Sequence, residues 1–337
     1  MTTYSDAGVD IDRGEEAVRR LKKHVEKTYS DDVLGGIGWF SGVINVKSLK
    51  NFTEPVLSFT IDGVGTKTII AAMLGRWKGI GHDIVNHCAN DLVCQGGTPL
   101  AFLDYLASST LDPAIVEEIV SGMSEACQTL DCVLIGGETA EMPKVYHKGA
   151  TDVAGAMVGV AERSKMITGE KIRAGDLLVA LPSSGLHTNG YSLARKVLLE
   201  DAKMDLGTKL EDTGITLGEA LLAPHTEYSR LVRKLHDAVG INGVAHITGG
   251  GIPGNLPRIL PKGLGAQVKR SAIGVLPLFT LMQEKGNVPQ EDMESAMNMG
   301  VGMILVIHPS KLEGVLREAK AAYVIGEVCK GEAVVIA

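Results

Sequence analysis

The sequence lacks any apolar run near the roughly 18 residues that a membrane-spanning helix needs. Its N-terminus, M-T-T-Y-S-D, also lacks the basic region followed by an apolar stretch that marks a secretory signal. From these two absences we expect a cytoplasmic protein that does not insert into membranes.

Paired cysteines and an excess of positive charge are also missing. The five cysteines are odd in number and form no C-x-x-C pair, so we expect reduced thiols, mostly buried. The net charge of −7 gives no electrostatic reason to expect nucleic acid or an anionic membrane surface as a partner.

What is present suits a globular protein of ordinary composition. With 337 residues, 45% hydrophobic and 22% charged, the chain is long enough for two domains. The 41 glycines cluster in short runs, which favours contacts between backbone and ligand over a flexible linker. The polar segment 162–176 is a candidate boundary, so we predict domains over 1–168 and 169–337, built in an α/β pattern.

The chain is organised around the stretch S-F-T-I-D-G-V-G-T-K-T at 58–68. The apolar run 56–61 predicts a mostly buried strand, and a helix is expected over 68–74. The turn between them combines a carboxylate for a hard cation, backbone N–H groups and a positive charge, a set that suits a polyphosphate with magnesium: Asp62, Gly63, Gly65, Thr66 and Lys67. Because Thr66 separates Gly65 from Lys67, the turn is not the common P-loop. A purely structural strand–turn–helix remains the alternative.

A second polar group follows on an apolar helix predicted over 81–95. Asp83, His87 and Asp91 recur at i, i+4 and i+8 on one face. We expect Asp83 to interact with the dipole at the helix N-terminus, and Asp91, near the C-terminus, to have a metal or a cationic partner. Zinc is less favoured here than a packed, hydrogen-bonded His87.

Four more glycine-containing segments follow or precede predicted elements. They are the loop 35–42, the carboxylate-bearing G-G-E-T-A-E-M-P at 136–143, the turn 182–190 and the triplet 249–251. The triplet at a helix N-terminus predicts an anion-binding nest. The remaining predicted strands are 100–106, 132–135, 152–160, 177–181, 301–307, 323–328 and 333–336, and the remaining helices are 13–27, one starting at Pro113 with Asp112 as its cap, 191–199, 253–260, 276–285, 290–297 and 309–321.

Seven of these stretches, in this order, resemble the phosphoribosylformylglycinamidine cyclo-ligase family over nearly the whole chain. They are Y-S-D-A-G-V-D-I at 4–11, D-G-V-G-T-K at 62–67, N-D-L-V at 90–93, P-L-A-F-L-D-Y at 99–105, G-G-E-T-A-E-M-P at 136–143, S-S-G-L-H-T-N-G-Y-S-L at 183–193 and I-T-G-G-G at 247–251. The resemblance implies ATP-dependent closure of formylglycinamidine ribonucleotide to aminoimidazole ribonucleotide. It also implies an N-terminal sheet domain that forms a barrel across a homodimer, a C-terminal mixed sheet with helices, and ATP bound near the dimer interface.

Residue by residue, the resemblance implies magnesium at Asp62 and Asp91, and Lys67 and Lys22 near the nucleotide. Glu141, His187 and Asn189 fall in its active-site motifs, and Thr248, Gly249, Gly250 and Gly251 would hold a phosphate. For His187 we expect acid–base work, since its pKa range suits moving the amidine proton.

The chain departs from the family pattern at Trp39, at His225-Thr226 and at Gly254. Relatives typically have a small residue in place of Trp39, Thr-Arg in place of His225-Thr226 and an acid in place of Gly254. These differences affect the residues expected to contact the substrate. The alternatives are another ATP-using kinase or synthetase of the same superfamily, or a non-catalytic nucleotide-binding maturation protein. Selenophosphate synthetase would want a cysteine in loop 35–42, which has none, and a hydrogenase-maturation relative would end in a reactive cysteine, whereas this chain ends V-V-I-A.

Overall fold

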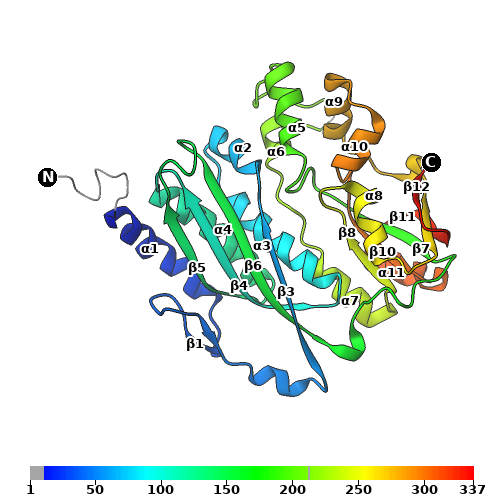
Figure 1. Cartoon of the computed structure of the whole chain (residues 1–337), viewed down its shortest axis with the longest axis horizontal. Coiled ribbons are helices and arrows are strands. Elements are labelled where there is room, and N and C mark those ends of the chain that lie inside the picture. Colours follow the sequence, from blue (N-terminus) through cyan, green and yellow to red (C-terminus); the bar gives the residue numbers. More distant parts are fainter. Residues whose placement is uncertain (1–10, 212) are drawn as a thin grey trace. The chain divides into compact units, whose positions relative to one another are not determined.

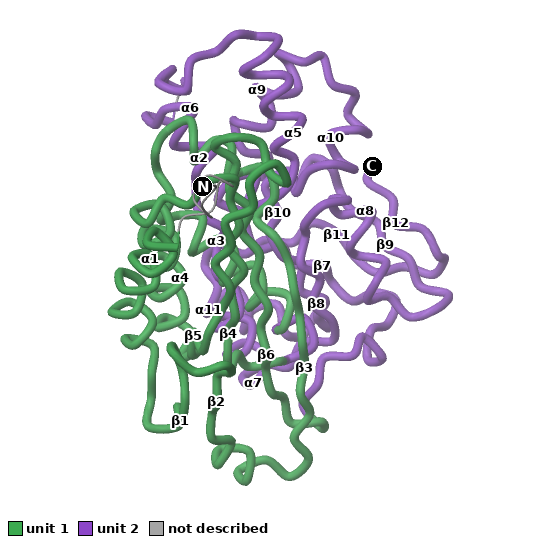
Figure 2. The backbone as a smooth tube through the Cα atoms, turned by 60° about the vertical axis from the view of Figure 1, so that its left-hand side comes forward, with its two compact units in different colours: residues 1–92, 97–164 green, residues 93–96, 165–337 purple. Residues whose placement is uncertain are grey.

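The structure is a computed structural model that describes residues 11–211 and 213–337. Residues 4–10 of the first motif therefore lie outside the described part. The chain divides into two compact units (Figure 2), one of residues 1–92 and 97–164 and the other of residues 93–96 and 165–337. Each unit holds a sheet with helices, which confirms the predicted mixed α/β class. Among the described residues, no helix is both long enough and apolar enough to cross a bilayer.

The first unit is built on a four-stranded sheet in the order β3-β6-β4-β5 (Figure 1). Strand β6 is antiparallel to both of its neighbours, whereas β4 and β5 run parallel and are joined by a helix. The strands are β3 (Pro55–Gly63), β4 (Thr98–Ser108), β5 (Val133–Glu141) and β6 (Thr151–Glu162).

Helices cover one face of this sheet. The aromatic ring of Phe102 on β4 and Ile84 on α3 both approach Gly155 of β6 so closely that a Cβ there would overlap them. The absence of a side chain at Gly155 therefore allows α3 to pack closely against the sheet. The unit's helices are α1 (Ile11–Val25), α2 (Lys67–Leu74), α3 (Lys78–Val93) and α4 (Pro113–Thr129), with 3-10 turns at Glu26–Thr28, Lys47–Asn51 and Arg163–Lys165. Asp112 caps α4 as predicted, because its side chain accepts from the N–H of Ala114.

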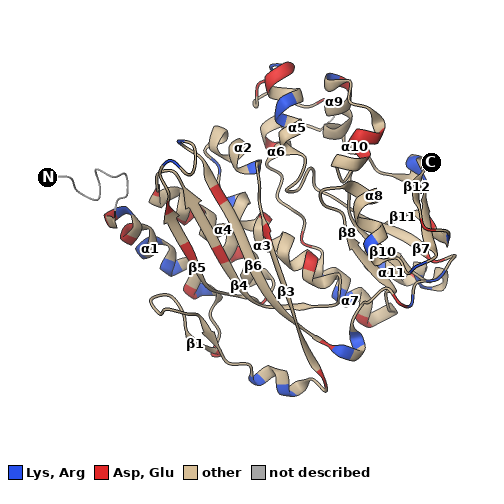
Figure 3. Ribbon diagram, in the orientation of Figure 1, with Lys and Arg blue, Asp and Glu red and all other residues tan. Residues whose placement is uncertain are grey.

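The opposite face of the sheet is apolar and largely open within the chain. On β3 the side chains of Leu57, Phe59 and Ile61 are 51%, 71% and 75% exposed, and residues 55–61 carry no charged side chain (Figure 3). The prediction that this strand is mostly buried is therefore wrong for one of its faces. An apolar run on both faces does predict cover on both sides, but the part of the chain that the structure describes covers only one of them.

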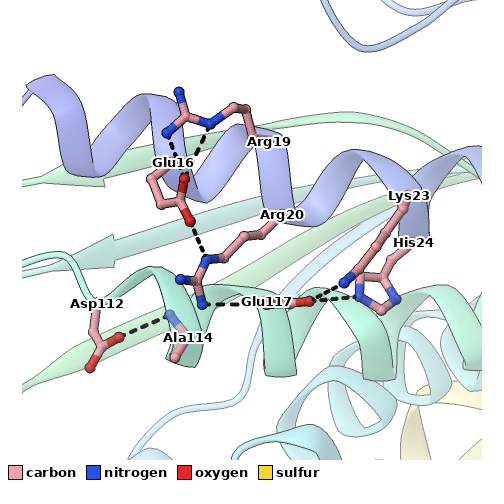
Figure 4. Close-up of polar contacts among 8 residues, drawn as sticks. All are labelled: Glu16, Arg19, Arg20, Lys23, His24, Asp112, Ala114 and Glu117. Atoms are coloured by element: carbon pink, nitrogen blue, oxygen red, sulfur yellow. Dashed lines mark hydrogen bonds and ion pairs between the residues drawn. The ribbon is translucent and has the colours of Figure 1, made fainter.

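A hairpin and an ion-pair cluster hold the edge of the sheet near β5. Strands β1 (Val33–Gly35) and β2 (Val43–Ile44) pair antiparallel, and Val33 and Ile44 pack on a small core of β4 and β5. Helix α1 lies along α4, where Glu117 contacts three basic side chains of α1, namely Arg20, Lys23 and His24 (Figure 4). The shortest of these contacts joins its Oε1 to Lys23 Nζ at 2.6 Å. Hydrogen bonds from Lys23 and His24 lower the pKa of Glu117.

The second unit is built on a six-stranded mixed sheet in the order β12-β9-β11-β7-β10-β8. Strand β10 lies inside it and all seven of its residues are buried, as its continuous apolar sequence predicts. The strands are β7 (Leu177–Pro182), β8 (Gly243–His246), β9 (Leu264–Val268), β10 (Val301–Ile307), β11 (Tyr323–Lys330) and β12 (Val334–Ile336). The helices are α5 (Tyr191–Ala194), α6 (Leu217–Leu221), α7 (Ser229–Val239), α8 (Gly251–Asn255), α9 (Pro277–Gly286), α10 (Gln290–Ala296) and α11 (Leu312–Glu318), with shorter turns at Leu256–Ile259, Arg270–Ala272 and Pro309–Lys311.

Several predicted elements differ from the structure. The strand expected to end at residue 135 continues as β5 to Glu141, because residues 136–141 pair in parallel with β4. The helix expected over 191–199 is α-helical only to Ala194 and continues as a π-helix, Arg195–Asp201. The sequence analysis missed β1, β2, β8, β9, α6 and α7. The cysteines agree with expectation, since all five are free and four are buried.

Candidate functional site

The first unit gathers Asp62, His87 and Asp91 into one polar cluster. His87 Nε2 lies 2.9 Å from Asp62 Oδ2 and 3.8 Å from Asp91 Oδ2. Thr60 on β3 donates to Asp91 Oδ2 at 3.3 Å, and the N–H of Gly63 donates to Asp62 Oδ1 at 2.6 Å. The end of β3 and the last turns of α3 thus place two carboxylates around one buried imidazole.

The two carboxylates of this cluster shift the pKa of the imidazole between them. Burial lowers the pKa of His87, but the hydrogen bond to Asp62 and the charge of Asp91 raise it, and the net direction is upward. Burial likewise opposes ionisation of Asp62, whereas the hydrogen bond with His87 lowers its pKa below the usual value. Both carboxylates stay about one-third or more exposed, at 40% and 32%, so a cation from solution can reach them. Their hard oxygen donors suit Mg²⁺ better than a softer metal.

Lys67 and Asp83 lie elsewhere than the sequence analysis placed them. Helix α3 begins at Lys78, three residues earlier than predicted, so Asp83 is beyond the first turn and is not a dipole partner at the N-terminus. Its Oδ2 lies 2.7 Å from Lys67 Nζ, and both side chains are fully buried. The ammonium expected to face a phosphate is instead part of a buried ion pair inside the first unit. Burial lowers the pKa of Lys67 even beside this carboxylate.

A large cavity lies along the β5 edge of the same sheet, and we call it the β5 pocket. It encloses about 1020 Å³, which is at the upper end of small-molecule sites. Helix α1, loop residues 36–42, the strand segment 135–139 and Glu141 line it, and Arg19 projects from α1 into its wall. Of the predicted residues only Glu141 is among the lining groups, and its Oε1 accepts from the N–H of Leu111 at 2.8 Å. Lys22 is not among them; it is exposed and lies 3.7 Å from Glu26.

The β5 pocket also contains a carboxyl group that the sequence analysis missed. Asp104, on β4, lines the pocket with Glu138. Burial raises the pKa of Asp104 to about 7, and the charge of Glu138 adds to the rise. Asp62 is on β3, three strands away from β5, which corresponds to about 14 Å at the usual spacing. Within this unit the pocket and the Asp62 cluster are therefore two separate places.

The loop that lines the β5 pocket contains Trp39, which stands where relatives typically have a small residue. The Trp39 ring lies on Gly35, where a Cβ would come within 2.3 Å of the ring. The N–H of Ile37 donates to the Tyr29 hydroxyl at 3.0 Å. Two aromatic side chains therefore fix the start of a loop that its glycines alone would leave free to move.

In the second unit the turn after β7 holds His187 and brings Asn189 to the glycine triplet. His187 adopts a left-handed backbone with φ of 61°, a strained conformation for a non-glycine residue. Its Nε2 accepts from the N–H of Ser184 at 3.2 Å. A Cβ on Gly249 would meet Asn189 Oδ1 at 2.8 Å, so this amide lies directly against the triplet.

The triplet itself has the backbone of an anion-binding nest. Gly250 and Gly251 have φ of 95° and 57°, and α8 begins at Gly251. Asn255 donates to the carbonyls of Gly249 and Gly251 at 3.1 and 2.9 Å and lies 3.5 Å from Thr248 Oγ1. The structure thus unites Asn189 with Thr248, Gly249, Gly250 and Gly251, as one site would require.

The sequences of the two units define a protein of the AIR synthase type. Residues 42–161 match the family "AIR synthase related protein, N-terminal domain", and residues 173–337 match "AIR synthase related protein, C-terminal domain". The chain belongs to the phosphoribosylformylglycinamidine cyclo-ligase family, which confirms the resemblance drawn from the sequence motifs.

Full-length relatives of that name are closely similar. The phosphoribosylformylglycinamidine cyclo-ligase of Geobacillus kaustophilus is 46% identical over 335 residues, covering 98% of this chain and 96% of its own length. The enzyme of Carboxydothermus hydrogenoformans is 47% identical over 338 residues, covering 99% and 98%.

Solved structures share the fold at much lower identity. Thiamine-monophosphate kinase from Stenotrophomonas maltophilia superposes with a TM-score of 0.71 at 17% identity, covering 95% of each chain. Hydrogenase maturation protein HypE in complex with ATP gives 0.68 at 18% identity, covering 94% of this chain and 90% of the other.

Proposed function

We propose that this chain closes formylglycinamidine ribonucleotide to aminoimidazole ribonucleotide, with ATP converted to ADP and phosphate, in purine biosynthesis. The observation that carries the proposal is a sequence identity of 43–47% to cyclo-ligases across both units. The kinase and HypE share only the fold, at 17–18% identity. A cytoplasmic location remains part of the proposal.

The chemistry divides into activation and ring closure. A formyl amide is a poor electrophile, so transfer of a phosphoryl group from ATP to the formyl oxygen activates its carbon. The amidine nitrogen then bonds to that carbon and loses a proton, and the oxygen leaves with the phosphate. Such a site mainly needs positioning and charge stabilisation.

The residues of the chain suit these tasks. Asp62 and Asp91 would hold Mg²⁺, which would offset charge on the phosphates. Thr248 and the glycine nest would bind the phosphate of the ribonucleotide through backbone N–H groups. His187 would take up the amidine proton at Nε2, which must first give up the hydrogen bond that it accepts from the N–H of Ser184. Asn189 would be an orienting group. The β5 pocket, with Glu141 and loop 36–42, has the size for a nucleotide.

The open sheet face supports a homodimer as part of this proposal. Contiguous exposed apolar side chains on a sheet mark an interaction surface. Among the described residues, no further strand pairs with the outer edge of β3. Two such faces packed together would close the sheets into the barrel that the resemblance implies. A partner lying there would also offer one nucleotide both a metal cluster and a β5 pocket, which are apart within one chain.

Light scattering tests the dimer. We expect twice the chain mass of 35.6 kDa at micromolar concentration, and a shift to 35.6 kDa in Phe59→Glu. Leu316→Glu is the matched control, because Leu316 is an exposed apolar residue of α11 in the other unit. A monomeric wild type, or loss of the dimer in both variants, would contradict a homodimer formed through the open face of the first unit's sheet.

An ADP-release assay tests the reaction. The purified chain is given ATP and Mg²⁺ with and without formylglycinamidine ribonucleotide, and the products are identified by mass spectrometry. We expect one ADP for each aminoimidazole ribonucleotide, and neither without the ribonucleotide. ADP release that ignores this substrate would instead favour another ATP-using enzyme of the fold. Nucleotide binding with no turnover would favour a maturation protein.

A further inference from the structure

Three buried histidines lie side by side in the second unit, although they come from separate segments. His187 follows β7, His225 lies between α6 and α7, and His246 ends β8. The rings of His187 and His225 are stacked, with centroids 4.0 Å apart and planes 19° from parallel. His225 Nε2 lies 3.0 Å from His246 Nε2. Their exposed fractions are only 2%, 1% and 6%.

The hydrogen bonds restrict where the protons lie. Because His187 Nε2 accepts from the N–H of Ser184, the neutral ring carries its proton on Nδ1. The bond between His225 and His246 has one hydrogen between two facing Nε2 atoms. In the neutral pair one ring must therefore be the Nε2–H tautomer and the other the Nδ1–H tautomer.

The backbone around His225 is held by other bonds. The hydroxyl of Ser184 donates to the carbonyl of Pro224 at 2.5 Å, and Tyr191 donates to that of Leu221 at 2.6 Å. Tyr228 donates to the carbonyl of Pro182 at 2.7 Å. Burial raises the pKa of Tyr228, so its hydroxyl remains a donor. A change confined to the His225 side chain therefore leaves these connections in place.

We propose that His225 is a positioning residue of the site. Its ring stack orients the His187 imidazole, and its hydrogen bond orients His246, which immediately precedes the segment that leads into the glycine nest. The His225 side chain thereby links His187 to the segment that carries the glycine nest. The inference rests on the proposed function, because His187 and the nest are assigned there.

Two substitutions separate the two contacts. His225→Phe keeps a flat ring to stack on His187 but cannot bond to His246. His225→Gln keeps a group that bonds to His246 but has no ring. We expect His225→Gln to lower kcat about ten- to hundredfold with little change in KM, because a small misplacement of a reacting group has effects of this size. His225→Phe should raise KM for the ribonucleotide about two- to tenfold and leave kcat near normal.

Long-range ¹H–¹⁵N spectra of the chain labelled with ¹⁵N-histidine give a readout besides activity. Resonances are assigned from the variants that lack each histidine. We expect His187 as the Nδ1–H tautomer and opposite tautomers for His225 and His246. His225→Phe should change the His246 signals and leave the His187 tautomer intact. His225→Gln should change the chemical shifts of the His187 ring.

His308→Gln is the control, because this exposed histidine caps the turn after β10, away from the three rings. Equal kinetic losses in both His225 variants, in proportion to their loss of thermal stability, would overturn the proposal. So would His246 signals that do not respond to His225→Phe. If the wild type does not convert the ribonucleotide, the proposed function fails, and the tautomers and their response to each substitution still decide whether His225 links the two histidines.

Discussion

Replacing Lys67 should destabilise the fold rather than weaken a phosphate contact. At 2.7 Å and an effective dielectric constant of 20, the attraction between Lys67 and Asp83 is about 6 kcal/mol. Removing both charges from water costs several kcal/mol per ion, so the intact pair contributes little net stability. Removing one partner leaves the other buried charge without its counterpart, and we expect Lys67→Met to lose about 3–5 kcal/mol.

The double variant Lys67→Met/Asp83→Leu is the informative one. It replaces both charges by apolar side chains, so we expect it to regain most of the stability lost by Lys67→Met. Urea unfolding of the wild type, the two single variants and the double variant gives the coupling energy. If each single variant loses about 3–5 kcal/mol and the double variant about 1 kcal/mol, the coupling energy is about 5–9 kcal/mol. The exposed pair Lys234–Glu318 is the control, because its atoms are also 2.7 Å apart. Its coupling should stay below about 1 kcal/mol.

Calorimetry with ATP and Mg²⁺ then decides between the two roles of Lys67. The structure predicts that the double variant keeps near-normal ATP affinity. A double variant that regains stability and still loses ATP affinity would refute the reasoning and return Lys67 to the phosphate site. If the double variant loses as much unfolding free energy as the two single variants together, the ion pair is not the reason why the single variants are destabilised.

Three further predictions concern carboxylates and His187. Asp62→Asn and Asp91→Asn should weaken Mg²⁺–ATP binding in calorimetry while thermal stability holds; lost stability with intact affinity would make them structural. His187→Gln should lower kcat about 10²- to 10⁴-fold at near-normal KM, and normal turnover would end its proton-transfer role. Asp104 binds its proton more tightly when folded, so its contribution to stability is complete below its unfolded pKa and is lost as pH rises through about 7. Asp104→Asn should therefore stabilise the chain more at pH 8 than at pH 5, by up to about 3 kcal/mol, because about two pH units separate pH 5 from the folded pKa. Equal gains at the two pH values would contradict this.

The sequence predicted the elements around the site better than the environment of its charges. The D-G-V-G-T-K turn correctly indicated a strand followed by a helix. That Asp62 holds magnesium stays a prediction. The turn could not show that Lys67 points inward, since that depends on Asp83, sixteen positions later and on another helix. His87 could be found from its i, i+4 spacing to Asp91, whereas its contact with Asp62 requires the packing of α3 on β3.

Residues brought together from distant segments carried the weakest signal. Asp104 lies in a strand whose apolar neighbours gave no sign that its carboxyl group faces a pocket. His225 was visible only as a departure from a motif, and its contacts join three segments spread over sixty residues. Helix α7 did have a usable signal, because Val232, Leu235 and Val239 recur at helical spacing.

The four residues 93–96 have a consequence for the order of synthesis. Residue 93 is the last of α3, and residues 94–96 follow it. All four belong to the second unit, where Val93 and Cys94 pack with residues of β7, β8 and β10. When the ribosome has completed residue 164, every segment of the first unit has been made, but the core that covers Val93 still awaits β10, about 140 residues later. At 5–20 residues per second, this apolar segment stays uncovered for about 7–30 s. The nascent chain therefore offers a chaperone a defined target during that interval.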